Sequence, residues 1–168
     1  TTLVKNSKKE YFALFDKKKN LFHEEFQHTA EIEYFKSPHQ NFRYRAEFGL
    51  IKSNNKKMFA MNIGGKKTAI HAFPIASQQI QELMSSLIKY INNNSEISEQ
   101  LFQVEFQSSR KNEAMVGLIY HKELDSKWEK EAELIGRELN ISIVGRSKNQ
   151  KVIIGKNYVT ETYKYLNN

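Results

Sequence analysis

The sequence predicts an α+β fold built on a mainly antiparallel sheet. Apolar and polar residues alternate in several short segments, as they do in strands that bury one face. Two of these segments flank Gly64–Gly65, a dipeptide that favours a two-residue β-hairpin turn. The third observation is a set of apolar residues at helical spacing, which predicts an amphipathic helix packed on the sheet: Ile80, Leu83, Met84, Leu87, Ile88 and Ile91.

The first part of the chain is expected to form a helix and two strands. Residues 5–22 predict the helix, because aromatic residues lie near one stripe: Tyr11, Phe12, Phe15 and Phe22. Segments 29–36 and 42–51 predict strands on either side of the break at Ser37–Pro38. In segment 42–51 every second residue is predicted to face the core: Phe42, Tyr44, Ala46 and Phe48.

The remaining elements follow in a regular order. Strand patterns cover residues 58–63, 66–73, 100–107, 113–121, 141–146 and 151–156. The helix after Phe73–Pro74 ends at Asn92–Asn94. Ser126 and Glu129 predict a capping box for a further helix, with an inner face of Trp128, Ala132, Ile135 and Leu139. From residue 66 to 146 the order is therefore β-α-β-β-α-β, which is that of a ferredoxin-like unit.

Positive charge is concentrated in three segments. The net charge of the chain is +7, and segments 5–19, 52–67 and 145–156 carry +4, +5 and +4, so the rest of the chain carries −6. Clustered positive charge on a mildly acidic body is typical of proteins that bind polyanions such as nucleic acids. The alternative is a set of lysine-rich loops that are merely solvated.

Several classes of site are excluded or disfavoured. The chain has no cysteine, which excludes disulfides, zinc–thiolate sites, iron–sulfur clusters and cysteine nucleophiles within it. The five histidines are scattered, so no metal site is predicted, and no glycine-rich phosphate loop is present. No apolar run approaches the roughly 20 residues of a membrane span. Without a secretory signal at its start, the chain is expected to be cytoplasmic, with no membrane partner.

One pair of side chains is a candidate for binding single-stranded bases. If segments 100–107 and 113–121 pair through a turn near Arg110, Phe102 faces Ile119 and His121 is its diagonal neighbour. An aromatic ring and an imidazole at the end of a hairpin can stack on unpaired bases. The alternative is that Phe102 lies on the core side of its strand, and the alternation alone favours the core.

Five segments, in this order, resemble the N-terminal half of the bacterial tRNA (uracil-5-)-methyltransferases. They are "FKSPHQNFRYRAEF" (35–48), "AFPIAS" (72–77), "LFQVEF" (101–106), "LIYHKELDSKWEKEAELIGREL" (118–139) and "IVGRSK" (143–148). The resemblance runs from about Phe22 to Tyr158. It implies an enzyme that methylates carbon 5 of the T-loop uridine of tRNA. Related enzymes with an iron–sulfur cluster in this half are a poorer match, because this chain has no cysteine.

The resemblance also implies a division of labour between two halves of the enzyme. The second half of the family's chain binds S-adenosylmethionine and supplies a cysteine nucleophile and a carboxylate base, and this sequence contains neither the cysteine nor the cofactor loop. Residues 1–28 are then an N-terminal helical segment, 29–156 an α+β RNA-recognition domain, and 157–168 a tail leading to an absent catalytic domain. No catalytic, cofactor or metal residue is expected here. The implied partners are the tRNA T-arm and the catalytic half, with transfer-messenger RNA left open.

Six residues match family positions that are expected to contact RNA. The resemblance places Phe102 and His121 against the T-loop and favours that role over the core. The other four are Arg43, Arg45, Arg146 and Lys148. An alternative for the first two arginines is an ion pair with Glu47 on the same strand face. Two further alternatives concern the whole chain: a stand-alone, non-catalytic RNA-binding module of ferredoxin-like fold, and a peptide-binding or purely structural domain.

Overall fold

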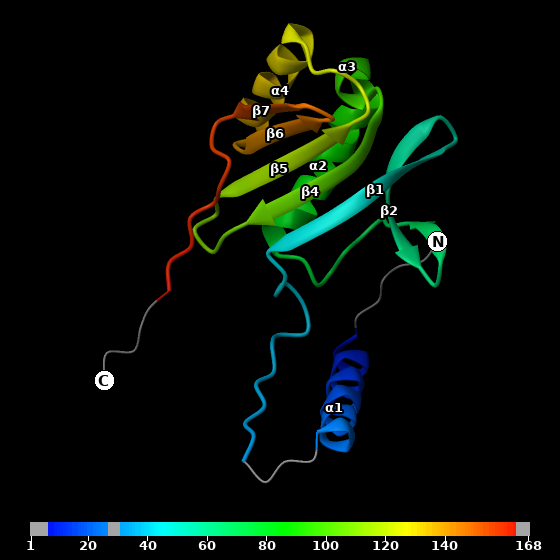
Figure 1. Ribbon diagram of the computed structural model, residues 1–168, viewed down its shortest axis with the longest axis vertical. Helices are drawn as coiled ribbons and strands as arrows, with labels where there is room; N and C mark the ends of the chain where they lie inside the picture. The colour runs from blue at the N-terminus through cyan, green and yellow to red at the C-terminus, as the bar shows by residue number, and fades with distance from the viewer. Residues whose placement is uncertain (1–6, 27–30, 164–168) are drawn as a thin grey trace.

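The computed structural model describes residues 7–26 and 31–163 of the chain (Figure 1). Its elements are α1 (Lys8–Glu25), β1 (Arg45–Ser53), β2 (Lys56–Ile63), β3 (Lys66–Ala69), α2 (Gln78–Asn93), α3 (Ser95–Ser98), β4 (Leu101–Ser108), β5 (Ala114–Tyr120), α4 (Ser126–Leu139), β6 (Ser142–Ser147) and β7 (Gln150–Ile154). The seven strands form one sheet in the order β3-β2-β1-β4-β5-β6-β7. The predicted α+β class is therefore confirmed.

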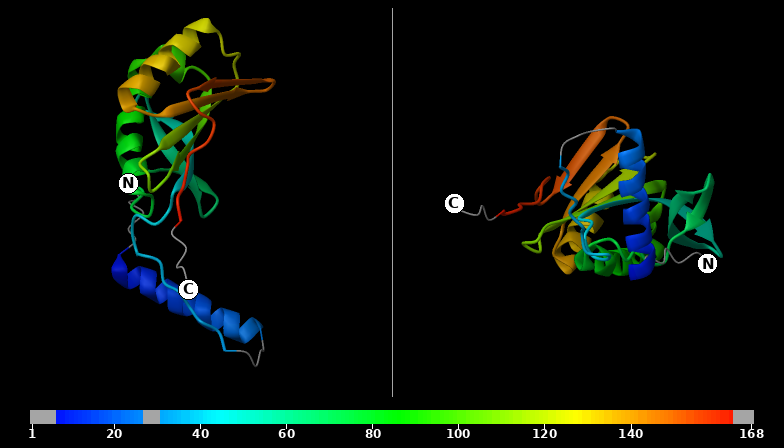
Figure 2. Two further views of the ribbon diagram at one scale, coloured as in Figure 1. Left: turned by 90° about the vertical axis from the view of Figure 1, so that its left-hand side faces the viewer. Right: turned by 90° about the horizontal axis from the view of Figure 1, so that it is seen from below.

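The sheet has one covered face and one open face. All neighbouring strands are antiparallel except β5 and β6. Helix α4 joins these two parallel strands, because parallel neighbours need a crossover connection. Helices α2, α3 and α4 lie on one face of the sheet, and no helix of the described chain covers the other face (Figures 1 and 2). We call this second side the open face.

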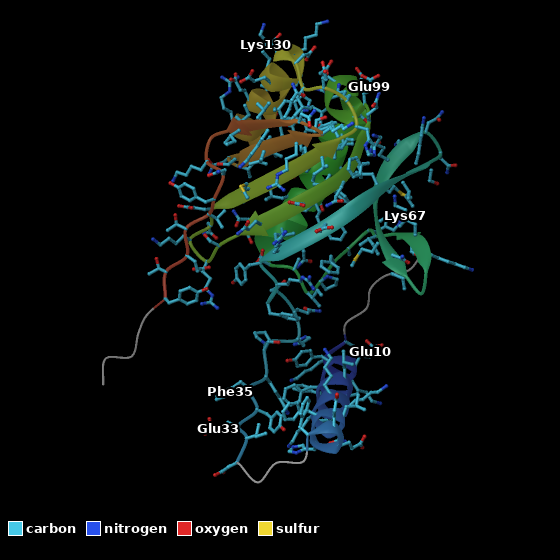
Figure 3. All side chains as sticks on the ribbon, viewed as in Figure 1. Glu10, Glu33, Phe35, Lys67, Glu99 and Lys130 are labelled. Atoms are coloured by element: carbon cyan, nitrogen blue, oxygen red, sulfur yellow. The ribbon has the colours of Figure 1, made fainter. Side chains whose placement is uncertain are left out.

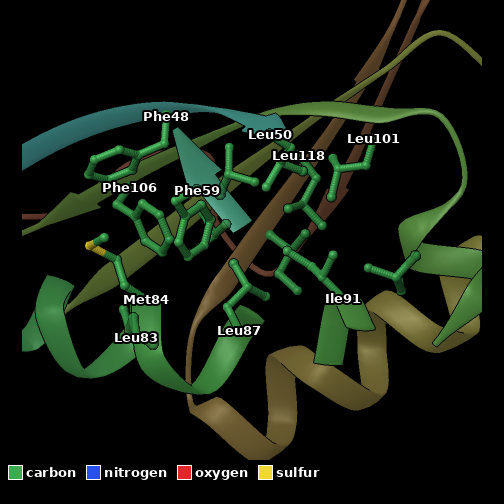
Figure 4. Packing of buried hydrophobic residues seen from close by; sticks show 14 of the residues in the cluster. Phe48, Leu50, Phe59, Leu83, Met84, Leu87, Ile91, Leu101, Phe106 and Leu118 are labelled. Carbon is green, nitrogen blue, oxygen red and sulfur yellow. The ribbon is translucent and has the colours of Figure 1, made fainter. Parts of the chain in front are cut away.

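The hydrophobic core fills the space between the sheet and its three helices (Figure 4). Helix α2 buries five residues of the stripe predicted from the sequence: Ile80, Leu83, Met84, Leu87 and Ile91. From β1, the ring of Phe48 packs edge-on against Phe73 and Phe106. Trp128 of α4 is fully buried, and a Cβ added to Gly145 would lie 2.3 Å from its ring. Glycine at this position therefore lets α4 pack closely on β6.

The hairpin predicted at Gly64–Gly65 is confirmed. These two glycines join β2 to β3 with backbone φ angles of 58° and 80°. Both values lie in the left-handed region that glycine adopts without steric cost. Asn54 and Asn55 join β1 to β2 in the same manner, with φ angles of 48° and 60°. The first three strands therefore form a meander with two tight turns.

The ferredoxin-like strand pairing is wrong, although the order of the elements is right. In a ferredoxin-like unit the first strand lies inside the sheet, next to the third. Here the first strand of the unit is β3, which has four residues, lies at the edge of the sheet and pairs only with β2. The two tight turns hold β3 beside β2 and β2 beside β1, so β1 takes the position next to β4.

Two strand predictions differ from the structure at the start of the chain. Residues 31–36 form no strand, and the rest of the predicted strand, 29–30, lies outside the described residues. The strand predicted over 42–51 begins at Arg45, because Arg43 bridges to Ala76 instead of joining the sheet. Ala46 and Phe48 are buried as predicted, whereas Phe42 and Tyr44 are only half-buried.

Two helix details also differ. The N-cap of α4 is Asp125, whose Oδ1 accepts hydrogen bonds from the backbone N–H groups of Lys127 and Trp128 at 3.0 Å. The N-cap predicted from the capping box with Glu129 was Ser126, and it is therefore wrong by one residue. The short helix α3 was not expected from the sequence, since four residues are too few to show a helical pattern.

Helix α1 packs against the segment that precedes β1, and none of its described residues is buried. The hydroxyl of Tyr11 lies 2.9 Å from that of Ser37. The ammonium of Lys36 lies 5.0 Å from the ring centroids of Phe12 and Phe15. The aromatic stripe predicted for this helix therefore contacts a neighbouring extended segment, not the core of the sheet.

Candidate RNA-binding surface

Residues of the open face are arranged in rows that cross the strands. Side chains that pair across neighbouring strands lie side by side on one face of a sheet. One row consists of Gly49, Gln103, Ile119, Arg146 and Lys151. In the next row Glu47 and Glu105 pair directly across β1 and β4. A row with two cations therefore lies beside a row with two carboxylates.

Phe102 and His121 stack on each other at one end of β4 and β5. Their ring centroids are 4.0 Å apart and the ring planes are inclined by 9°. Phe102 is half-buried and His121 is exposed. Phe102 directly precedes Gln103 of the first row, and His121 directly follows β5. A stacked pair that reaches solvent is a platform on which an unpaired base can continue the stack.

A β-bulge in β4 places Phe102 outside the regular strand pairing. Leu101 pairs with Tyr120 and Gln103 pairs with Ile119, so Phe102 has no partner in β5. Bulges of this kind change the direction of a side chain. The predicted pairing of Phe102 with Ile119 is therefore wrong by one residue.

Because of this bulge, Phe102 does not lie on the core side of β4. Val104 and Phe106 are fully buried, as the alternation predicts for the core side of β4. Phe102 would share their side in a regular strand, yet it is half-buried and stacks on the exposed ring of His121. The alternative in which all three residues belong to the core is wrong for Phe102.

The residues on both sides of His121 are anchored to α3. The buried hydroxyl of Tyr120 donates a hydrogen bond to the carbonyl oxygen of Ile97 at 2.8 Å, and burial raises the pKa of this tyrosine. The ammonium of Lys122 forms an ion pair with Glu96 at 2.5 Å and donates to the backbone carbonyl of the same residue at 2.9 Å. His121 is therefore held between two fixed neighbours while its own ring stays exposed.

Arg146 and Lys148 lie at this same end of the sheet. Arg146 belongs to the first row and forms an ion pair with Glu105 at 3.4 Å, with 47% of its side chain exposed. Gly117 leaves room for that carboxylate, since a Cβ there would lie 3.3 Å from Oε2 of Glu105. Lys148 is exposed in the turn between β6 and β7. We call Phe102, His121, Arg146 and Lys148 the stacking end.

Arg43 and Arg45 lie at the opposite end of the open face, which we call the arginine end. Arg45 pairs with Gln107, four residues further along β4 than Gln103. At a rise of about 3.3 Å per residue, this separation is about 13 Å. The six predicted residues therefore form two groups and not one.

The alternative for these arginines, an ion pair with Glu47, is not formed in the described structure. The ion pairs among the described residues do not include either arginine. Arg43 instead donates from Nε to the carbonyl oxygen of Arg45 at 2.9 Å, and its backbone N–H donates to the carbonyl of Ile75 at 2.8 Å. Both arginines are exposed residues.

The tail after β7 returns to the arginine end, a contact that the sequence did not reveal. The backbone N–H of Arg110 donates to Glu161 at 3.0 Å, and that of Thr160 donates to Glu113 at 2.7 Å. These backbone hydrogen bonds are the main cause that lowers the pKa of both glutamates. A pocket of about 830 Å³ lies beside the tail, with Arg43, Tyr44, Arg45, Gln107, Glu161 and Tyr163 in its lining.

The strand-to-helix connections described in the structure lack the glycine-rich turn of a Rossmann-type site for S-adenosylmethionine, the cofactor that the resemblance implies. Adenosylmethionine domains of the Rossmann type place a glycine-rich turn between a strand and a helix. In the described chain, a strand leads into a helix at residues 70–77 and 121–125, and neither connection contains a glycine. The described residues also contain no group of three or more candidate metal ligands and no helix long and apolar enough to span a membrane.

Comparison with known proteins identifies the family. A family profile described as tRNA (Uracil-5-)-methyltransferase matches residues 10–167. A tRNA/tmRNA (uracil-C(5))-methyltransferase of Acinetobacter baumannii (strain ACICU) is 41% identical over 142 residues, which cover 81% of this chain and 39% of that protein. A protein of the same description from Pseudomonas entomophila is 42% identical over 136 residues, which cover 79% and 38%. This chain thus spans about two fifths of the length of these curated relatives, and it belongs to the tRNA (uracil-5-)-methyltransferase family.

Proposed function

We propose that this chain is the RNA-recognition part of an S-adenosylmethionine-dependent enzyme that methylates carbon 5 of the T-loop uridine in tRNA. The observation that carries the proposal is the stacked pair of Phe102 and His121, which reaches solvent beside Arg146 and Lys148. The relatives are described as acting on tRNA and tmRNA, so both RNAs are candidate partners.

The stacking end combines the two features that single-stranded RNA requires. Each base stacked on an aromatic side chain contributes roughly 1–3 kcal/mol to binding. Cations beside the platform neutralise the phosphates that flank the stacked base. Phe102 and His121 provide the platform, and Arg146 and Lys148 provide the cations. Arg43 and Arg45 then contact phosphates further along the same arm of the RNA.

We assign no chemical step to these 168 residues. The family's nucleophile is a cysteine, and the sequence has none. S-adenosylmethionine supplies the methyl group in the family, and the described strand-to-helix connections contain no glycine-rich turn to hold it. We therefore expect this chain to bind the T-arm and to leave methyl transfer to a catalytic domain.

Replacing Phe102 and His121 together by alanine tests the proposal. We expect affinity for tRNA to fall about tenfold or more, since the loss of one base stack costs roughly 1–3 kcal/mol. The fold should persist, because Phe102 is not part of the buried core. The matched control is Tyr34→Ala with His23→Ala, which removes a second aromatic–imidazole contact, with centroids 5.5 Å apart, from the α1 region.

Unchanged affinity in a double variant that is still folded would contradict the proposal. Equal losses in the variant and in the control would contradict it too, because they would make the effect a general loss of aromatic surface. A second assay uses tRNA and labelled S-adenosylmethionine. Methyl transfer above background by this chain would overturn the assignment of catalysis to another domain.

A further inference from the structure

The lysines of the β1–β3 meander are divided between the two faces of the sheet. Segment 52–67 carries five lysines and no acidic residue. Lys56 pairs with Ser53 and Lys67 pairs with Asn62, which places both lysines on the open face with Gly49. Lys66 pairs with Ile63 and points to the other face, because successive residues of a strand alternate.

One lysine of this segment already has a structural role. The backbone of Lys57 exchanges hydrogen bonds with the side chain of Asn92, and its ammonium donates to the carbonyl oxygens of Ser98 and, at 3.1 Å, Leu101. Burial, with a smaller contribution from Lys52, lowers the pKa of Lys57. This lysine links β2 to the start of β4 and is not available for a ligand.

Lys67 lies across a row of small residues. Gly49, Ala60 and Ala69 pair with one another across β1, β2 and β3. Figure 3 labels Lys67, which belongs to β3. A Cβ added to Gly49 would lie 3.1 Å from Cε and 3.4 Å from Nζ of this lysine. Ala60 is 1% exposed although it lies outside the main core cluster. The missing side chain at Gly49 therefore leaves space in which the end of Lys67 rests.

This arrangement places the Lys67 ammonium in line with the stacking end. Gly49 pairs with Gln103, which directly follows Phe102, and the row continues to Arg146. With strands about 4.8 Å apart, three strand spacings separate Gly49 from Arg146 by about 14 Å. A cation therefore lies on each side of the Phe102–His121 pair.

We propose that Lys67, seated over Gly49, contacts an RNA phosphate, so that the bound strand crosses the sheet along the row from Lys67 to Arg146. This inference rests on the proposed function, since it extends the same RNA-binding surface toward β3. The proposed ligand of Lys67 is the phosphate backbone of RNA. The open face of the meander carries lysines, and Glu47 is its one acidic residue among the described residues.

The test compares Lys67→Met with Lys66→Met. Both changes remove one positive charge from neighbouring positions of the same strand, and both keep an aliphatic side chain. Each phosphate contact adds about 0.7–0.9 to the slope of log affinity against log salt concentration. Between about 50 and 200 mM salt, tRNA affinity should therefore fall about threefold less for Lys67→Met than for the wild type. Lys66→Met should keep the wild-type slope.

A second variant moves the ammonium without changing the charge. Gly49→Val suits a strand and removes the space that Lys67 occupies. We expect it to reproduce the lower slope of Lys67→Met, and the double variant to show no further loss. Equal slopes for Lys66→Met and Lys67→Met, with normal wild-type binding, would overturn this inference and leave the proposed function intact. Absence of tRNA binding by the wild type would overturn both.

Discussion

The stacking end and the arginine end of the open face carry the same sign of charge in different surroundings. At the stacking end, Arg146 lies in a row next to a stacked aromatic pair. At the arginine end, Arg43 and Arg45 lie beside a pocket that the tail helps to form. Glu47 and Glu105 lie between the two ends. The two ends therefore share their positive charge and differ in the groups beside it, which are a stacked aromatic–imidazole pair at one end and a pocket beside the tail at the other.

The largest expected effect is a loss of stability when α4 can no longer pack closely on β6, the strand that carries Arg146 of the stacking end. Gly145→Ala adds a Cβ that would lie 2.3 Å from the ring of Trp128, which is fully buried. Overpacking of this kind costs about 1–3 kcal/mol or more. Thermal unfolding should show a lower Tm for this variant. Gly49→Ala is the control, because its Cβ would come within 3.4 Å only of the flexible end of Lys67. An equally low Tm for this control would contradict the packing explanation.

The next effect separates the two ends by their contribution to RNA binding. Under the proposed function Arg146→Ala removes one phosphate contact, and it also leaves the Glu105 carboxylate without its cation. We therefore expect the salt slope of tRNA binding to fall by about 1. Arg45→Ala should have a smaller effect, since this residue lies beyond the acidic row. Titrations at several salt concentrations measure both slopes. A larger loss of salt slope for Arg45→Ala than for Arg146→Ala would contradict the proposal that the main phosphate contact lies at the stacking end.

A smaller effect concerns the loop that carries His121 into α4. Asp125→Ala removes the N-cap that accepts two backbone hydrogen bonds, so Tm should fall by a few degrees. Ser126→Ala should leave Tm nearly unchanged, because Ser126 is not the cap. The backbone hydrogen bond from Trp128 is the main cause of the lowered Asp125 pKa. The stabilisation by the Asp125 cap is therefore present above the pKa of this carboxyl in the unfolded chain and is lost as the pH falls through its lower pKa in the folded chain. A difference in Tm between the wild type and Asp125→Ala that does not change with pH would contradict this.

The smallest effect is expected at the arginine end, where the tail is attached. Glu113 and Glu161 have lowered pKa values because they accept backbone hydrogen bonds from Thr160 and Arg110. Protonation removes these acceptors, so the attachment is fully present above the ordinary pKa of a glutamate and is lost as the pH falls through the lowered pKa of the folded chain. Hydrogen exchange should show less protection of both amides at low pH, after correction for intrinsic exchange rates. Glu113→Gln should lower protection at Thr160 already at neutral pH.

The fold was predictable where local patterns determine it. The α2 stripe and the Gly64–Gly65 turn depend on residues close in sequence, and both predictions are confirmed. The position of β3 depends on which strand takes the place next to β4, and no local pattern contains that information. The N-cap of α4 was missed because Asp125 and Ser126 are both good capping residues and only the backbone angles distinguish them.

The residues of the candidate site remain predictions from the sequence, and the structure adds how they are arranged. Alternation along β4 assigned Phe102 to the core, because a bulge inserts one residue that a regular pattern cannot show. The resemblance to a known family favoured the surface at this position, and the structure places Phe102 against the exposed His121. The separation of Arg45 from Arg146 along the strands follows from the register of β1 on β4, which the sequence did not predict.

The most direct test of the account is an NMR titration of the isotope-labelled chain with a T-arm stem–loop RNA. We expect the largest shift changes at the rings of Phe102 and His121 and at the backbone of Ile119 and Arg146, with smaller changes at Arg45. Stacking of a base should move the ring protons of His121 upfield. Shift changes confined to the arginine end, or none at RNA concentrations that saturate binding, would contradict the claim that the stacking end recognises the T-loop.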